Sequence, residues 1–389
     1  MKKSLILLST LMMSLCVTGC KKDNSSNSSK EETSPILNSY SIHRDDEFGG
    51  AYIDISIADF NNLGFKFGDS LDLSFSNSVK YNDIGYYSGY YVPAGQELVV
   101  GYPGYDFIKF CINYGDDVYT MNNFNKDTKV TITVHEGQKY IDIEETLSIS
   151  YSDDPTKYDS IEQFANFREM KVGNLKEGIL YRGASPIDNR RNRAASVDAL
   201  LEQHGIQYDI DLADKQLTNN SFAAVDNKPL LGASNFVIGE YFQTLLDDNK
   251  VVLLGMAAAY KNADFASKMK TMFEAILNND GPYYIHCLEG KDRTGFVCMV
   301  IEALCGASYE EIVDDYFVTY SNYYGIEKGS KKYETIKNLH IDEMIRYVFG
   351  FEKSANLLTA NYRSKVNGYL LDIGLSQTQI DSIQTKLSK

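Results

Sequence analysis

Several residue types are scarce in this chain, and their scarcity narrows the classes of function that it can have. Its 389 residues include only six cysteines and five histidines. The histidines are scattered, and neither a CxxC nor an HxxxH motif occurs, so the sequence gives no sign of a metal site. We therefore expect a protein that works without a metal ion or an organic cofactor.

Basic residues are outnumbered by acidic ones. The chain has 38 lysines and arginines against 53 aspartates and glutamates, a formal net charge of −15. An acidic surface is repelled by nucleic-acid phosphates and by anionic lipid head groups. The composition therefore predicts no nucleic-acid partner, and no attachment to a membrane by charge alone.

The first twenty residues carry a targeting pattern. Two lysines precede an apolar run from Leu5 to Val17, which leads into Val-Thr-Gly-Cys20. The run is shorter than the roughly 20 residues of a spanning helix, and small residues before a cysteine are typical of a lipoprotein signal. We expect residues 1–20 to be a signal peptide and lipobox, with Cys20 lipidated and the protein anchored to the outer face of a bacterial membrane. A plain secretory signal is the alternative.

The next two segments are a linker and a β-rich region. Residues 21–35 are rich in serine and asparagine, without an apolar period, and are typical of a flexible linker. Residues 36–150 alternate apolar and polar residues in short runs separated by glycine and proline, which predicts an accessory barrel or sandwich. The clearest runs are Tyr52–Ile57, Leu71–Phe75, Val130–Val134 and Ile141–Ile143. The many tyrosines between 81 and 105 either pack these strands or form a ligand-binding face.

From about residue 155 the pattern changes to alternating strands and helices, an α/β arrangement. The stretch that organises this region begins with Tyr283–His286, which is suited to a buried strand. It ends with Phe296–Leu304, an apolar segment that predicts a buried helix stopped by Gly306. Between the two lies a tight loop from Cys287 to Arg293, with the sequence CLEGKDR.

The residue types in this loop point to phosphoryl transfer. A loop that enters a helix N-terminus directs backbone N–H groups and the positive end of the helix dipole at an anion. Gly290 permits the dihedral angles of such a loop, and the fork of Arg293 can hold two phosphate oxygens. Beside these donors the pKa of Cys287 should fall below its usual value of about 8.5. The loop therefore predicts a nucleophile that forms a cysteinyl-phosphate.

Neighbouring residues receive supporting roles in this hypothesis. Thr294 can donate a hydrogen bond to the sulfur when it leaves, and His286 is expected to orient the loop through the backbone. Lys291 and Asp292 are either solvated charges or part of the site. The predicted catalytic residues are Cys287, Arg293, Asp292 and Thr294, and the predicted substrate-binding residues are His286, Leu288, Glu289, Gly290 and Lys291.

The segment HCLEGKDRTG, residues 286–295, resembles the signature loop of the protein tyrosine phosphatase superfamily. Its Gly-Lys-Asp-Arg-Thr-Gly form is similar to an atypical bacterial branch that acts on phosphotyrosine and often on phosphoinositides. The resemblance covers residues 155–389 and implies a central, mostly parallel sheet flanked by helices, with the small all-β domain separate from it. In that branch the lysine helps with multiply phosphorylated or lipid substrates.

The sequence differs from the bacterial branch that it resembles in the residue expected to act as general acid. Many relatives carry an aspartate on a loop before the signature, but residues 255–260 read GMAAAY and contain no carboxylate. Asp292, Asp264 and Asp214 remain as candidates to protonate the leaving group. We favour Asp292 because the loop should place it at the mouth of the pocket. Asp264 falls where a helix cap is expected, and Asp214 suits a structural role.

Two further observations complete the sequence-based hypothesis. Arg190, Arg191 and Arg193 open a helix at Ala194–Gln203, either as a solvated helix end or as a rim that attracts anions. Cys111, Cys298 and Cys305 form an odd and sparse set, which implies no disulfide framework.

The expected function is hydrolysis of phosphate monoesters in phosphotyrosine proteins, with phosphoinositides as a further substrate class. An inositol polyphosphate phosphatase and a catalytically silent surface lipoprotein that binds phosphate are the alternatives. The membrane contact is expected through the N-terminal lipid.

Overall fold

The computed structural model describes residues 34–46, 48–93, 95–215, 236–256, 260 and 263–389. The predicted signal peptide, Cys20 and nearly all of the 21–35 linker lie outside these residues. Within the described part of the chain, no helix is both long enough and apolar enough to span a bilayer.

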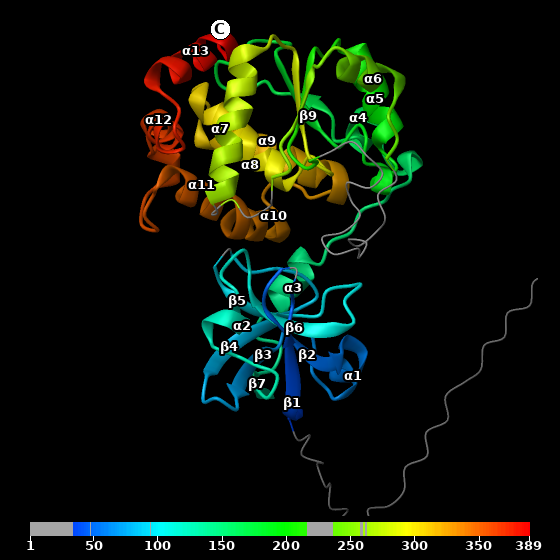
Figure 1. Ribbon diagram of the computed structural model, residues 1–389, viewed down its shortest axis with the longest axis vertical. Helices are drawn as coiled ribbons and strands as arrows, with labels where there is room; N and C mark the ends of the chain where they lie inside the picture. Colours follow the sequence, from blue (N-terminus) through cyan, green and yellow to red (C-terminus); the bar gives the residue numbers. More distant parts are fainter. Residues whose placement is uncertain (1–33, 47, 94, 216–235, 257–259, 261–262) are drawn as a thin grey trace, which may run out of the picture. The chain divides into compact units, whose positions relative to one another are not determined.

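Residues 36–136 form a closed seven-stranded barrel with the strand order β1-β2-β6-β5-β4-β3-β7 (Figure 1). All neighbours are antiparallel except β4 and β5. The alternation seen in the sequence places Leu71, Leu73 and Phe75 in the barrel core, so the expected small all-β domain is confirmed. Its strands are β1 Ile36–Arg44, β2 Ala51–Ser56, β3 Ser70–Phe75, β4 Lys80–Tyr87, β5 Glu97–Val100, β6 Phe107–Ile112 and β7 Lys129–Glu136, and its helices are α1 Ile57–Asn62 and α2 Val118–Met121.

One predicted strand is wrong. The run Ile141–Ile143 belongs to helix α3, which spans Ile141–Leu147. Three residues of alternation are too few to separate a two-residue period from one turn of a helix. The acidic side chains of Asp142 and Glu144 lie in the first turn, where a helix favours negative charge.

The rest of the described chain contains a five-stranded sheet with the order β11-β10-β12-β9-β8. The pairs β11–β10, β10–β12 and β12–β9 are parallel, and β8 joins β9 as an antiparallel hairpin. The predicted central strand is confirmed with the bounds expected from the sequence. The strands are β8 Arg168–Glu169, β9 Leu180–Gly183, β10 Tyr208–Asp211, β11 Val251–Leu253 and β12 Tyr283–His286.

Helices cover both faces of this sheet, as alternate side chains of β12 show. Tyr283 and Ile285 belong to a core shared with α7, α8 and α9, whereas Tyr284 packs against α5 and α6. Figure 1 shows α5 and α6 on the side of the sheet opposite α7 and α8. The α/β fold class is therefore confirmed. The helices are α4 Ile161–Phe164, α5 Ala194–Gln203, α6 Glu240–Asp247, α7 Ala263–Asn278, α8 Asp292–Leu304, α9 Tyr309–Tyr324, α10 Lys331–Ile336, α11 Asp342–Phe349, α12 Tyr362–Asp372 and α13 Gln377–Leu387.

The sequence predicted the ends of several helices from local chemistry. Helix α8 is buried from Thr294 to Leu304, and Gly306 follows it with a φ of +82°. Ser308 and Glu311 form the expected capping box at the start of α9. An equivalent box opens α13 at Ser376. These ends depend on contacts a few residues apart, which a sequence displays directly.

Candidate active site

The loop that follows β12 packs so closely against β9 that only glycine fits at its centre. Residues 287–291 connect His286 to the start of α8 at Asp292. Gly290 has a φ of +69°, and a Cβ atom there would lie 2.2 Å from the carbonyl oxygen of Gly183 at the end of β9. The loop can therefore press against the neighbouring strand only because this position has no side chain.

The carbonyl oxygens of the loop are bound from outside. Ser185 N donates to Leu288 O at 3.1 Å, and the Tyr323 hydroxyl donates to Glu289 O at 2.9 Å. Arg182 Nη2 donates to Gly290 O at 3.0 Å. The N–H and C=O groups of a trans peptide point in opposite directions, so these bonds turn the loop amides inward. Such inward amides can receive an anion.

The electrostatics of Cys287 favour the thiolate. Its side chain is buried, and burial raises the pKa of the thiol. The Arg293 guanidinium and the hydroxyl and backbone amide of Thr294 act in the opposite direction and lower the pKa below its ordinary value. Among the sequence-predicted residues, Cys287, Arg293 and Thr294 thus lie together in one constellation.

Arg293 acts on the Cys287 sulfur and also lines a cavity, although Cys287 itself is not among the residues of the cavity wall. Its Nη1 atom donates to Met256 O at 3.0 Å, which uses one of the five N–H donors of the guanidinium. The same side chain lines a cavity whose wall also includes Glu289, Lys291 and Asp292. An anion in this cavity would therefore meet the residue that stabilises the thiolate.

His286 lies behind the loop. It is fully buried, with Nε2 3.1 Å from Asp209 Oδ1 and Nδ1 3.3 Å from Cys287 O. Burial lowers the pKa of this imidazole, but the Asp209 and Asp211 carboxylates outweigh burial and raise it to about 10. His286 therefore supports the loop from behind, and neither it nor Leu288 lines the cavity.

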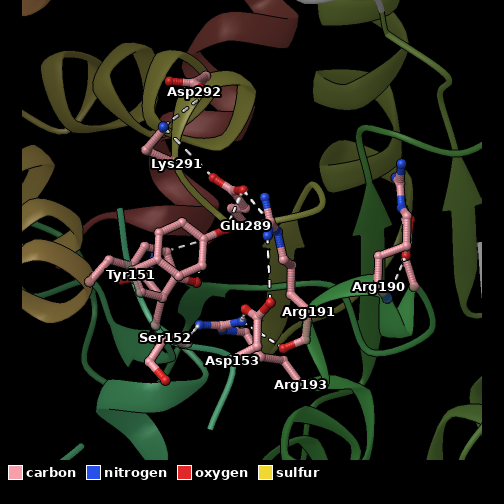
Figure 2. Close-up of polar contacts among 12 residues, drawn as sticks. Tyr151, Ser152, Asp153, Arg190, Arg191, Arg193, Glu289, Lys291 and Asp292 are labelled. Carbon is pink, nitrogen blue, oxygen red and sulfur yellow. Dashed lines mark hydrogen bonds and ion pairs between the residues drawn. The ribbon is translucent and has the colours of Figure 1, made fainter. Parts of the chain in front are cut away.

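A chain of charged side chains from the cavity wall is linked by ion pairs (Figure 2). Lys291 Nζ lies 3.7 Å from Glu289 Oε2 and 3.8 Å from Asp292 Oδ2. The side chain of Asp292 is 61% exposed, whereas that of Glu289 is only 18% exposed. Asp292 is therefore the carboxylate that bulk water reaches most easily.

The three candidates for the general acid lie in different surroundings. Asp292 lines the cavity. Asp264 forms an ion pair with Lys268 on α7 at 2.6 Å. Asp214 is buried, and burial together with the neighbouring carboxyl of Asp211 raises its pKa to about 9. Among the three, the structure brings only Asp292 to the cavity wall.

The three arginines before α5 have different partners and lie in different surroundings. Arg190 pairs with Asp188 at 2.6 Å, does not line the cavity, and lies apart from Glu289 in Figure 2. Arg193 is buried and donates to Phe164 O and to Asp153. Arg191 lines the cavity, with Nε 3.5 Å from Glu289 Oε1. The helix bounds Ala194–Gln203 are confirmed, and one of the three cations faces the site.

Sequence reasoning missed Tyr151, whose hydroxyl donates to the Glu289 carboxylate. The two residues are 138 positions apart, and no periodicity or motif connects them. In the described part of the chain, no group of three or more histidine, cysteine or carboxylate side chains could hold a metal ion.

Comparisons with known proteins give the family. Residues 160–389 match the model described as the tyrosine phosphatase family. A tyrosine-protein phosphatase from Nostoc commune is 24% identical over 202 residues, which cover 48% of this chain and 67% of that protein. Among solved structures, the core catalytic domain of the PP-IP phosphatase SIW14 from S. cerevisiae, in complex with citrate, is similar at 20% identity. That similarity covers 47% of this chain and 90% of the yeast chain, with a TM-score of 0.27. Because the family match spans more than half of the chain, this protein belongs to the tyrosine phosphatase family of phosphatases.

Proposed function

We propose that this phosphatase hydrolyses phosphate monoesters through a cysteinyl-phosphate on Cys287, with phosphotyrosine proteins and phosphoinositides as its substrates. The observation that carries the proposal is the double role of Arg293. Its guanidinium lowers the pKa of the Cys287 thiol and also lines the cavity that would receive the phosphate.

The proposed first step is an in-line displacement at phosphorus. The Cys287 thiolate attacks, the S–P bond forms, and the bond between phosphorus and the leaving oxygen breaks. Arg293 and the inward loop amides hold the equatorial oxygens, where negative charge is spread in the transition state. Thr294 donates a hydrogen bond to the sulfur when the thiolate leaves in the second step.

Asp292 is the proposed general acid. It protonates the departing oxygen and then, as a carboxylate, accepts a proton from the water that attacks the cysteinyl-phosphate. That attack releases inorganic phosphate and restores the thiolate. The support for this role is its place on the cavity wall and its exposure to water.

The walls of the cavity support the proposed substrate classes. Tyr316, Tyr320 and Tyr324 offer aromatic surface for a phenyl ring, which favours phosphotyrosine. Lys291 and Arg191 add positive charge beside Arg293, which suits a substrate with a further phosphate group, including an inositol polyphosphate.

A substrate panel on the full chain tests the proposal. Phosphate release is measured from a phosphotyrosine peptide, a phosphoinositide and inositol hexakisphosphate, with Cys287→Ser as the blank. We expect turnover in the wild type and none in the variant, while inorganic phosphate still binds to the variant. Rapid acid quenching followed by mass spectrometry should find phosphate on Cys287. A wild type that binds phosphate but never forms this adduct would support the silent binding protein instead.

We also propose that the protein is exported and held at the bacterial surface by a lipid on Cys20. The support is the pattern of lysines, apolar run and Val-Thr-Gly-Cys at the start of the chain. Detergent-phase partitioning of the wild type and of Cys20→Ala tests this. Equal partitioning of both into the aqueous phase would contradict it.

A further inference from the structure

Tyr151 lies upstream of the residues that match the family, on the segment between α3 and the short helical turn Pro155–Lys157. Its ring stacks on Tyr323 of α9, with centroids 4.7 Å apart and an interplanar angle of 18°. Its hydroxyl donates to the carboxylate of Glu289 in the signature loop, the segment 287–293 (Figure 2). A residue outside the segment that matches the family thus contacts the loop that carries the nucleophile.

The Glu289 carboxylate depends on this hydroxyl. The cations near it are more distant, with Arg191 Nε at 3.5 Å and Lys291 Nζ at 3.7 Å. Charge-assisted hydrogen bonds measure about 2.7–2.9 Å, so neither cation makes one. Among the described residues, Tyr151 is therefore the donor that satisfies this side chain.

The carboxylate is nevertheless charged. Burial raises the pKa of Glu289, but Lys291, the Tyr151 hydroxyl and then Arg191 and Arg193 lower it below its usual value. A mostly buried carboxylate that loses its closest donor must find another or be left unsatisfied. The nearest groups that could replace this donor are the two cations on the cavity wall, Arg191 and Lys291.

The ring of Tyr151 is fixed from several sides. The guanidinium carbons of Arg191 and Arg193 lie 5.1 Å and 5.0 Å from its centroid, a cation–π arrangement. Arg193 also donates to Asp153 at 2.8 Å and to Ser152 O at 3.1 Å. These contacts hold the segment in place, so the hydroxyl is presented to Glu289 at a defined point.

We propose that Tyr151 is a positioning residue of the signature loop, which holds the Glu289 carboxylate and keeps Lys291 and Arg191 on the cavity wall. The inference rests on the proposed function, because it assigns the loop to phosphate binding. Without the hydroxyl, Glu289 draws one of the two cations toward itself. The loop amides next to Glu289 then shift relative to Cys287.

The test uses full-chain variants that remove single hydroxyl groups. Tyr151→Phe keeps the ring and its stacking, and loses only the bond to Glu289. Tyr158→Phe is the matched control: its hydroxyl donates to Ser152 O at 2.6 Å and accepts from Arg193 Nη2 at 3.2 Å, so its loss disturbs the same segment without removing a contact to the signature loop. Each variant is assayed with p-nitrophenyl phosphate for kcat and KM, with vanadate for binding, and by thermal unfolding.

We expect Tyr151→Phe to lower kcat/KM by about tenfold and to weaken vanadate binding, with a thermal midpoint like that of Tyr158→Phe. Tyr158→Phe should match the wild type in both assays. Because Tyr151 acts through Glu289, the double variant Tyr151→Phe/Glu289→Gln should lose no more activity than Glu289→Gln alone.

Several results would overturn the inference. They are wild-type kinetics in Tyr151→Phe, equal losses in Tyr151→Phe and Tyr158→Phe, and a double variant whose loss is the product of the two single losses. Cys287→Ser separates this failure from that of the proposed function. If Cys287→Ser is inactive while Tyr151→Phe is unaffected, only the positioning role is lost; if Cys287→Ser turns over normally, the proposed function itself is wrong.

Discussion

At the scale of single residues, the position of Asp292 gives the proposed mechanism its clearest test. It is the first residue of α8 and lies on the cavity wall beside Lys291. A general acid matters most when the leaving oxygen is a strong base, because such an oxygen cannot depart as an anion. The effect of removing the acid should therefore depend on the substrate.

We predict that Asp292→Asn lowers kcat by roughly 10²- to 10⁴-fold for alkyl phosphates, whose leaving groups are poor. With p-nitrophenyl phosphate, which has a good leaving group, the loss should be much smaller. Steady-state kinetics across a series of phenols and alcohols measures this, and Asp264→Asn on α7 is the control. Equal losses for good and poor leaving groups would remove Asp292 from this role.

At the scale of elements, the signature loop depends on β9 as much as on the strand and helix that flank it. Gly290 sits against Gly183, the last residue of β9, and Arg182 from the same strand binds its carbonyl oxygen. The hairpin of β8 and β9 therefore forms one wall of the loop. A change in this packing should therefore lower the activity that depends on Cys287 more than it lowers the stability of the fold.

We predict that Gly290→Ala reduces kcat/KM by at least about 100-fold, because the new Cβ would lie 2.2 Å from Gly183 O at a φ of +69°. Gly205→Ala is a matched control, with a φ of +61° and no atom within 4 Å of the added Cβ. Both variants carry the backbone cost of a left-handed residue, but only the first displaces the loop. Equal activity in the two, measured with p-nitrophenyl phosphate, would contradict this account.

Features that depend on neighbours in the sequence could be predicted. The strand Tyr283–His286, the helix Ala194–Gln203 and the capping box at Ser308 follow from periodicity and from side-chain chemistry three residues apart. The run Ile141–Ile143 was predicted as a strand because three residues fit both periods equally well.

Features that depend on distant partners could not be predicted. The three arginines before α5 are alike in sequence, yet their different partners leave only Arg191 at the cavity. Tyr151 lies 138 positions from its partner Glu289 in the sequence, and a single tyrosine on an irregular segment gives no sign of such a contact. Tertiary contacts of this kind carry no local pattern.

At the scale of the whole molecule, the sheet holds a set of buried ionisable groups under the loop. Asp209, Asp211 and His286 have no exposed surface, and Asp214 is 2% exposed. Burial, followed by the Asp211 carboxyl, raises the pKa of Asp214 to about 9. The native state therefore keeps a proton on Asp214 that the unfolded chain, with a pKa of about 3.9, releases at neutral pH.

We predict that this group makes the protein less stable as the pH rises. A raised native pKa contributes stability that is complete below about pH 3.9 and is lost progressively up to about pH 9. Asn does not titrate, so the stability of Asp214→Asn relative to the wild type should increase between pH 5 and 8.5. The slope has an upper limit of about 1.4 kcal/mol per pH unit for one proton.

Urea unfolding at several pH values measures this difference. Asp372→Asn, at the exposed end of α12, removes a surface carboxyl and serves as the control. A constant difference between Asp214→Asn and the wild type over the whole range would show that the native state holds no extra proton at this position.

The contacts of Arg193 have a practical consequence for anyone who trims this enzyme. Two of its acceptors, Asp153 and Ser152 O, come before residue 160, where the family match begins. A fragment that begins at residue 160 would leave the buried Arg193 guanidinium without these acceptors. Each buried donor left unsatisfied would lower the free energy of unfolding by about 1–3 kcal/mol. The smallest self-sufficient phosphatase in this chain should therefore begin ahead of Tyr151, several residues before the start of the family match.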